Sequence, residues 1–152
     1  SRRARPDPAP SALPSGPMTP LAEYFQQDHF AADAGIELVE AADGRAVARM
    51  KLEPRHQNAA GVVQGGALFT LADFAFAAAA NSRGQLSLGT GASINFLRPA
   101  RAGVLTAEAR EESLSRRLFT GTVRVTDERG ELVAIFTGTA FRKDDPVPPP
   151  AG

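Results

Sequence analysis

The segment HQNAAGVVQGGALFTLADFAFAAAANSRG, residues 56–84, decides the fold. From Gln64 to about Asn81 it is rich in alanine, contains no proline and carries one charged side chain, that of Asp73. These features predict a helix that is apolar on all sides. Residues 59–80 are about as long as a membrane span, but polar residues and a glycine pair interrupt them. We therefore expect no membrane span, but a helix buried inside the protein.

The rest of the chain supplies elements that can wrap such a helix. Residues 19–30 predict a short amphipathic helix, and Asp43-Gly44 between two alternating runs is a strong hairpin signal. Four strand-like runs follow the long helix, at 88–98, 103–112, 117–126 and 131–142. The last run is apolar on both faces, which indicates a central strand. This order predicts an α+β fold in which a hairpin and a four-stranded meander form one antiparallel sheet around one long helix.

We expect a single domain over residues 19–143. Residues 1–18 hold five prolines and three arginines, and residues 144–152 are polar and rich in proline. Segments of this composition cannot bury enough apolar surface to offset the entropy lost on ordering. Both ends are therefore predicted to be disordered tails.

Composition narrows the classes of function. Seventeen basic residues balance seventeen acidic ones, so nothing in the net charge points to nucleic acid or to an anionic membrane. The absence of cysteine excludes disulfides, thiolate metal sites and a cysteine nucleophile, and it fits the cytoplasm. The sequence offers only two histidines as nitrogen ligands for zinc, so we expect no metal site.

Asp73 is the first candidate for chemistry. It is the only fully charged side chain between Arg55 and Arg83, near the middle of the expected buried helix. An ionised carboxylate in an apolar setting is costly unless it is paired, protonated or facing a polar cleft. Asp73 is thus either a catalytic carboxylate or a structural one bonded to a hydroxyl or to a subunit partner.

Gly65 and Gly66 open the same helix. The first turn of a helix offers unpaired N–H groups and a partial positive charge, which suit a carbonyl oxygen that becomes an oxyanion. A loop hinge without a ligand is the alternative. Gly65 and Asp73 are eight residues apart, or roughly 12 Å along a helix. One reacting carbon cannot touch both, so a shared reaction predicts a dimer with two composite sites, in which Asp73 comes from the second copy.

The same segment resembles the hotdog-fold thioesterases of the phenylacetyl-CoA thioesterase type. Their signature is H-x-N, a His-Gly-Gly helix start and an alanine-rich helix with Asp or Glu, and SINFLRPARAG at 93–103 is similar to the strand and turn that follow. The resemblance covers residues 20–143 and implies a hotdog fold. It also implies that Asp73 is the general base or nucleophile, that the Gly65 N–H polarises the thioester carbonyl, and that Asn58 orients the water or the carboxylate.

Four further residues are possible supporting groups. Gln64 stands where the family has histidine, and its amide can still donate and accept hydrogen bonds at the helix start beside Gly66. His56 is the histidine of H-x-N, and ordering its loop is the favoured role over direct catalysis. Thr90 is the hydroxyl nearest to the position where the family often places Ser or Thr.

The resemblance implies an acyl-CoA thioesterase that uses no cofactor, since coenzyme A is part of the substrate, and an aryl or arylacetyl group is favoured. Phe74 and Phe76, or aromatic residues across a dimer, are candidates to line the acyl pocket. The family's dimers frequently pair into tetramers, so a homodimer that forms a dimer of dimers is expected. Four arginines could meet the phosphates of CoA or be ordinary surface residues: Arg98, Arg101, Arg116 and Arg117.

Two other functions stay open. A hotdog dehydratase pairs a catalytic histidine with Asp or Glu, and this chain has no histidine in the long helix or at its start. A non-catalytic acyl-CoA-binding module would keep the glycines and the pocket, but it could dispense with the carboxylate of Asp73.

Overall fold

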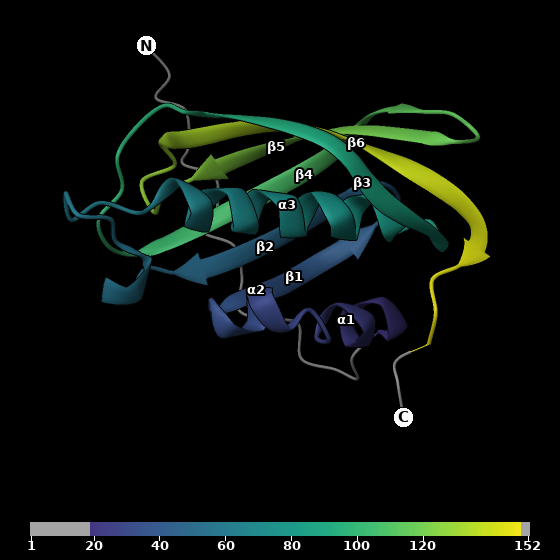
Figure 1. Cartoon of the computed structure of the whole chain (residues 1–152), viewed down its shortest axis with the longest axis horizontal. Helices are drawn as coiled ribbons and strands as arrows, with labels where there is room; N and C mark the ends of the chain where they lie inside the picture. Colours follow the sequence, from purple (N-terminus) through teal and green to yellow (C-terminus); the bar gives the residue numbers. More distant parts are fainter. Residues whose placement is uncertain (1–18, 150–152) are drawn as a thin grey trace, which may run out of the picture.

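One long helix, α3 (Gly65–Asn81), lies against the inner face of a six-stranded antiparallel sheet (Figure 1). The computed structural model describes residues 19–149, so the tail expected at 1–18 lies outside the described residues. The α+β prediction, one sheet wrapped around one helix, is confirmed. The strands are β1 (Ile36–Ala42), β2 (Arg45–Lys51), β3 (Gln85–Phe96), β4 (Val104–Leu114), β5 (Leu118–Thr126) and β6 (Leu132–Pro146), in the order β1-β2-β4-β5-β6-β3.

Small side chains on both surfaces allow α3 to lie close to the sheet. Leu71, Ala72, Ala75 and Ala79 of α3 are completely buried. The strands contribute alanines that are almost fully buried: Ala46, Ala48, Ala107, Ala109, Ala134 and Ala140. No helix of the described residues is long and apolar enough to cross a membrane.

The hairpin predicted at Asp43-Gly44 is confirmed. Both residues have positive φ, 52° and 81°, and Ala42 pairs with Arg45 across the turn. Two consecutive residues of positive φ define the type I′ turn, whose twist matches that of the flanking strands. This explains why Asp-Gly stands at this position.

The predicted meander is wrong for its first strand. β3 pairs with β6 at the edge of the sheet, and the chain then crosses to β4 in the interior, between β2 and β5. Only β4, β5 and β6 form a meander. β6 lies between β5 and β3, so its expected central position is confirmed.

The two ends of the domain also differ from the expectation. The helix predicted over residues 19–30 is broken into α1 (Pro20–Phe25) and α2 (His29–Asp33), because the Asp28 side chain accepts from the Ala31 N–H and starts a new helix. At the C-terminal end, the tail predicted from residue 144 is wrong for its first residues, which belong to a strand. β6 continues to Pro146, which pairs with Gln85.

The expectation of a fully buried helix is wrong for a single chain. One strip of α3, at helical spacing, faces away from the sheet. Gly66 and Asp73 are exposed there, and Thr70 and Ala77 are partly exposed. Phe69 borders the strip: it is 37% exposed, but its ring packs on Phe136 of β6 with the centroids 5.4 Å apart. In the sequence, Gly66, Thr70 and Ala77 are small enough to belong to a helix that is apolar on all sides, although the opposite face of the helix is the one that packs on the sheet.

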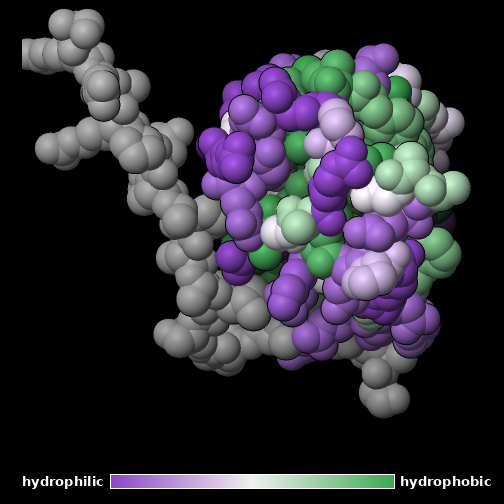
Figure 2. Space-filling view, turned by 90° about the vertical axis from the view of Figure 1, so that its left-hand side faces the viewer, coloured by the Kyte–Doolittle hydropathy of each residue, from purple (hydrophilic) through white to green (hydrophobic). Residues whose placement is uncertain are grey.

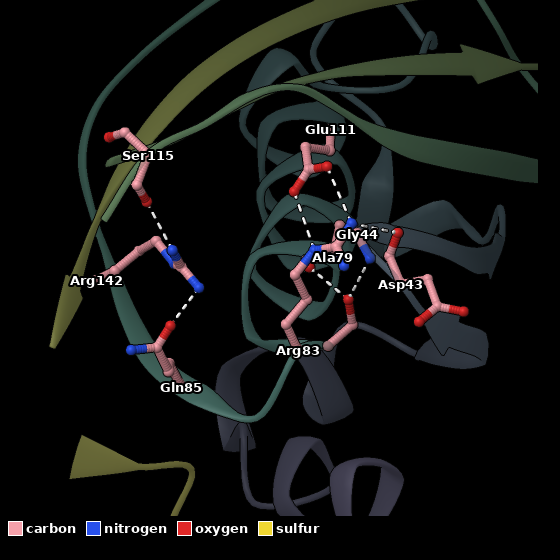
Figure 3. A network of polar contacts seen from close by, with 9 residues as sticks. Asp43, Gly44, Ala79, Arg83, Gln85, Glu111, Ser115 and Arg142 are labelled. Atoms are coloured by element: carbon pink, nitrogen blue, oxygen red, sulfur yellow. Dashed lines mark hydrogen bonds and ion pairs between the residues drawn. The ribbon is translucent and has the colours of Figure 1, made fainter. Parts of the chain in front are cut away.

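Polar contacts fix the C-terminal end of α3. The Ser82 hydroxyl accepts a hydrogen bond from the Gly44 N–H (2.7 Å), and Arg83 forms an ion pair with Glu111 of β4 (3.0 Å; Figure 3). The helix end is thus tied to the β1–β2 turn and to β4. Its position along the sheet, and with it the position of its start, is set.

Asn81 joins α3 to β3 through a buried amide. Its Nδ2 donates to the Ser87 carbonyl (3.1 Å) and to the Ala77 carbonyl (2.8 Å), and its Oδ1 accepts from the Ser87 N–H (2.8 Å). Asn81 and Ser87 are both buried. The amide therefore satisfies backbone groups that no water reaches.

Replacing Asn81 by alanine should lower the free energy of unfolding by about 2 kcal/mol, because the buried N–H and carbonyl of Ser87 lose their partner. Urea denaturation followed by circular dichroism measures the change. Asn95→Ala, on the exposed face of β3, is the matched control and should change the stability little. An equal, small effect of both variants would contradict the role given to Asn81.

Candidate active site

A cavity of about 370 Å³ opens at the end of the molecule where α3 begins. Figure 2 looks at this end, where hydrophobic residues reach the surface between hydrophilic ones. The cavity lies between the start of α3, the loop before it and the end of β3. Its lining residues are Asn58, Val62, Val63, Gly65, Leu68, Phe96, Leu97, Arg98 and Pro99.

Gln64 is the N-cap of α3. Its Oε1 accepts from the Gly66 N–H (2.7 Å), and its carbonyl accepts from the N–H groups of Ala67 (2.9 Å) and Leu68 (3.3 Å). A Cβ at residue 66 would lie 2.5 Å from that Oε1, so a larger residue there would force the Gln64 side chain to shift. Gln64 thus acts as a capping residue of the kind that starts a helix, and Gly66 has no donor left for a ligand.

The Gly65 N–H is the donor that remains. Among the first-turn N–H groups of α3, it alone finds no acceptor within the described residues. A Cβ at residue 65 would lie 2.9 Å from the Phe96 ring, so the ring packs directly on this glycine. The cavity therefore contains one free, helix-polarised N–H beside an aromatic side chain.

Asn58 lines the same cavity, and its amide has a fixed orientation. Its Oδ1 accepts from the N–H groups of Ala60 (2.9 Å) and Val62 (3.2 Å) in its own loop. The oxygen is occupied, and the NH₂ group is what the side chain can offer to a ligand. Asn58 and Gly65, which the sequence grouped together, therefore present two donors to one cavity.

Asp73 lies two turns further along α3, on its open strip and outside this cavity. Partial burial raises the pKa of its carboxyl above the ordinary value, and the nearby charge of Asp28 raises it further. No base pairs with Asp73 among the described residues. The carboxylate that the sequence singled out is thus open to a partner or substrate, and it is separate from the Gly65 cavity of its own chain.

His56 and Thr90 are both held by hydrogen bonds to the backbone in the described chain. His56 is buried, and both of its ring nitrogens are hydrogen-bonded to the backbone. Thr90 sits at a bulge in β3, where its hydroxyl donates to the Thr139 carbonyl (3.1 Å). The favoured ordering role of His56 agrees with these contacts.

The four arginines fall into two groups. Arg98 lines the cavity and pairs with Glu131 (3.3 Å), and Arg101 lies near it with its Nη1 at 3.5 Å from the Gly61 carbonyl. Arg116 and Arg117 follow β4 at the opposite end of the molecule (Figure 1), where Arg117 forms a bidentate pair with an aspartate of β6. Within one chain, the last two are far from the cavity.

The aromatic residues expected to line the pocket are core residues instead. Phe74 packs on Phe25 with ring centroids 5.6 Å apart, and Phe76 packs between Phe119 and a phenylalanine of β6. Both rings are buried, because they point from α3 toward α1 and the sheet. The aromatic side chain of the cavity is Phe96.

Comparisons with known proteins agree with this geometry. The family model described as the Thioesterase superfamily matches residues 60–134. The acyl-coenzyme A thioesterase PaaI of Escherichia coli is 33% identical over 78% of this chain and 85% of its own, and its solved structure superimposes with a TM-score of 0.75 over 84% of this chain and 99% of that one. The chain belongs to the hotdog-fold thioesterases of the PaaI type. It is a thioester hydrolase.

Two further solved structures are similar to this thioesterase. A point mutant of the phenylacetic acid degradation protein PaaI from Thermus thermophilus is 40% identical, with a TM-score of 0.73 over 76% of this chain and all of that one. A hypothetical thioesterase from Streptococcus pneumoniae, solved with coenzyme A, is 28% identical, with a TM-score of 0.72 over 78% of this chain and 96% of that one.

Sequence reasoning missed two residues near the candidate site. Phe96 stood in the quoted SINFLRPARAG segment, and the glycine at position 65 was the signal that something packs against the backbone there. Asp28 was not considered because it is the N-cap of a different helix, 45 positions before Asp73. Only the fold brings the two carboxylates near one another.

Asp28→Asn should lower the pKa of the Asp73 carboxyl toward its ordinary value, because a neighbouring negative charge is removed while the partial burial stays. Asparagine still caps α2, so the helix is kept. NMR titration of the side-chain carboxyl carbons measures the shift. Asp33→Asn, at the other end of α2, is the matched control, and an equal shift in both variants would contradict the assignment.

Proposed function

We propose that this thioester hydrolase cleaves acyl-CoA to a free acid and coenzyme A, with an arylacetyl or aryl group as the acyl part. The observation that carries the proposal is the pair of donors in one cavity, the free N–H of Gly65 and the NH₂ group of Asn58. The names of the similar proteins, which mention acyl-coenzyme A, coenzyme A and phenylacetic acid degradation, support this substrate class.

In the proposed mechanism, the thioester carbonyl oxygen accepts a hydrogen bond from the Gly65 N–H. Charge that develops on this oxygen is stabilised by the positive end of the α3 dipole. Asp73, ionised, either takes a proton from the attacking water or attacks the carbonyl carbon itself. When Asp73 is the base, it passes this proton to the sulfur as the C–S bond breaks, so CoA leaves as the thiol and the acid is released. When Asp73 is the nucleophile, CoA leaves as the thiolate and takes a proton from water, and a second water hydrolyses the acyl–Asp73 anhydride, which releases the acid and restores the carboxylate. Asn58 can only donate, so it orients the water or the carboxylate by a bond to its oxygen.

A second copy of the chain supplies the carboxylate. β3 is an edge strand, most of it is exposed, and the open strip of α3 with Asp73 lies on the helix beside it. Pairing of two β3 strands would satisfy the free edge and place the two α3 helices antiparallel. In that arrangement, Asp73 of one copy faces the Gly65 cavity of the other. The antiparallel helices thus bring together two groups that lie roughly 12 Å apart within one helix.

Other parts of the proposal concern the surroundings of the site. Phe96 provides an apolar wall near the thioester, and Arg98, held by Glu131, can exchange that partner for a phosphate of CoA. The outer face of the sheet, which no described helix covers, is the surface for pairing two dimers into a tetramer. The proposed chemistry uses side chains, backbone and water, with no cofactor besides the CoA of the substrate. The absence of cysteine fits a location in the cytoplasm.

Asp73→Asn should lower kcat for acyl-CoA hydrolysis by about 100-fold or more, because the amide can neither accept a proton nor attack the carbonyl. Release of free CoA thiol across a panel of aryl, arylacetyl and aliphatic acyl-CoAs is the measurement. Asp28→Asn is the control that keeps a carboxylate at residue 73. If the wild type binds these thioesters but hydrolyses none, the chain is a binding module and the proposed reaction is wrong.

The composite site predicts complementation between two inactive variants. Asp73→Asn and Asn58→Ala homodimers should both be nearly inactive, since each of their sites lacks one group. After mixing and exchange of subunits, half of the dimers hold one intact site, which restores about a quarter of the wild-type activity. Thiol release before and after exchange measures the gain. No gain from dimers shown to have exchanged would mean that both groups act within one chain.

A further inference from the structure

His56 is a buried residue whose imidazole has no free nitrogen. Its Nδ1 accepts a hydrogen bond from the Glu53 N–H (3.0 Å), and its Nε2 lies 2.7 Å from the Ala34 carbonyl. A carbonyl only accepts, so Nε2 carries the hydrogen and Nδ1 carries a lone pair. Both contacts together fit one form of the ring, the neutral Nε2–H tautomer.

The backbone of the same residue continues these connections. The His56 carbonyl accepts from the Gln64 N–H (2.7 Å), and the His56 N–H donates to the Glu53 carbonyl (2.9 Å). Gln64 is the cap that leaves only Gly65 with a free donor. His56 therefore links the start of α3 directly to the loop in front of it.

Asn58, two residues beyond His56, is held by the same loop. A backbone bridge joins Gln57 to Val63, and the Asn58 N–H donates to the Val62 carbonyl (2.7 Å). The distance between the Asn58 amide and the Gly65 N–H thus depends on the 56–64 loop as one unit. The ring of His56 anchors the beginning of that unit in the protein interior.

On its other side the ring reaches α2, whose C-cap is Ala34. The N-cap of this short helix is Asp28, which lies near Asp73. In the proposed dimer, Asn58 and Gly65 belong to one active site, and Asp73 of the same chain belongs to the other. The His56–Ala34 bond therefore connects the surroundings of both.

We infer that His56 is a positioning residue of this hydrolase, which acts through Asn58 and Gly65 by fixing their loop to the end of α2. The inference rests on the proposed function for the roles of Asn58 and Gly65. His56 itself touches no reacting atom. Its neutral ring is required because a hydrogen on Nδ1 would face the Glu53 N–H.

The first test is a split between kcat and KM. His56→Ala should lower kcat by about 100-fold, because a donor displaced by about 1 Å stabilises the developing charge poorly, while KM changes little. His56→Asn keeps an acceptor for the Glu53 N–H, and His56→Gln keeps a donor for the Ala34 carbonyl, so each should recover part of kcat. If no variant changes kcat at temperatures where it stays folded, the inference is overturned.

Asn81→Ala is the matched control. Asn81 is also a buried polar residue that bonds to the backbone at an end of α3, but at the end far from the cavity. It should destabilise the protein as His56→Ala does and leave kcat near that of the wild type. If Asn81→Ala lowers kcat as strongly as His56→Ala, loss of stability explains both results and the positioning role is wrong.

Hydrogen exchange separates this inference from the proposed function. Amides of residues 57–66, followed by mass spectrometry in the full-length protein, should exchange faster in His56→Ala than in the wild type or in Asn81→Ala. This measurement needs no substrate. If the wild type cleaves no acyl-CoA, the proposed function fails and the exchange rates alone decide the positioning role; unchanged exchange in His56→Ala overturns it.

Discussion

The packing of α3 on the sheet is the contact on which the rest of the molecule depends. Helix and strands meet through small residues, so their backbones come close, and the larger side chains need space of their own. The Phe76 ring lies over two glycines of the sheet. A Cβ at Gly138 would lie 3.0 Å from this ring, and a Cβ at Gly121 would lie 3.3 Å from it. An added methyl at such a place forces the packed rings apart. The glycines of β5 and β6 are therefore part of the helix-binding surface.

This packing also determines where the reactive groups lie. Ser82 and Arg83 tie the far end of α3 to the β1–β2 turn and to β4, and its first residues lie at the opposite end of the sheet, next to the end of β3. There Gln64 satisfies the Gly66 N–H and leaves the Gly65 N–H free. Gln64 thus acts as the cap of α3. A side-chain oxygen at this position is sufficient to select one donor from the first turn.

Local sequence patterns predicted those parts of the fold that local physics determines. Asp43-Gly44 requires positive φ at two residues, and the alternation in residues 117–126 places one face of β5 in the core. Alternation does not say which strand is the neighbour, so the pairing of β3 with β6 could not be predicted. The same holds for the site. Asn58, Gly65 and Asp73 are recognisable from their setting in the sequence, whereas Phe96 and Asp28 reach the site from distant segments.

The open strip of α3 is the reason why the prediction of a fully buried helix is wrong for a single chain. Gly66, Thr70 and Ala77 are small residues on the strip that a single chain leaves open, and Phe69 borders this strip while its ring packs on Phe136. A helix on the surface of a monomer would carry charged residues along such a strip, but this strip carries one, Asp73. The same strip adjoins β3, a long edge strand without the lysines or prolines that usually protect such an edge. The apolar character of α3 on all sides is thus what a helix needs when the sheet covers one side and a second copy covers the other. In the proposed dimer, Asp73 would meet an environment built from two chains, which would give a lone carboxylate a chemical use.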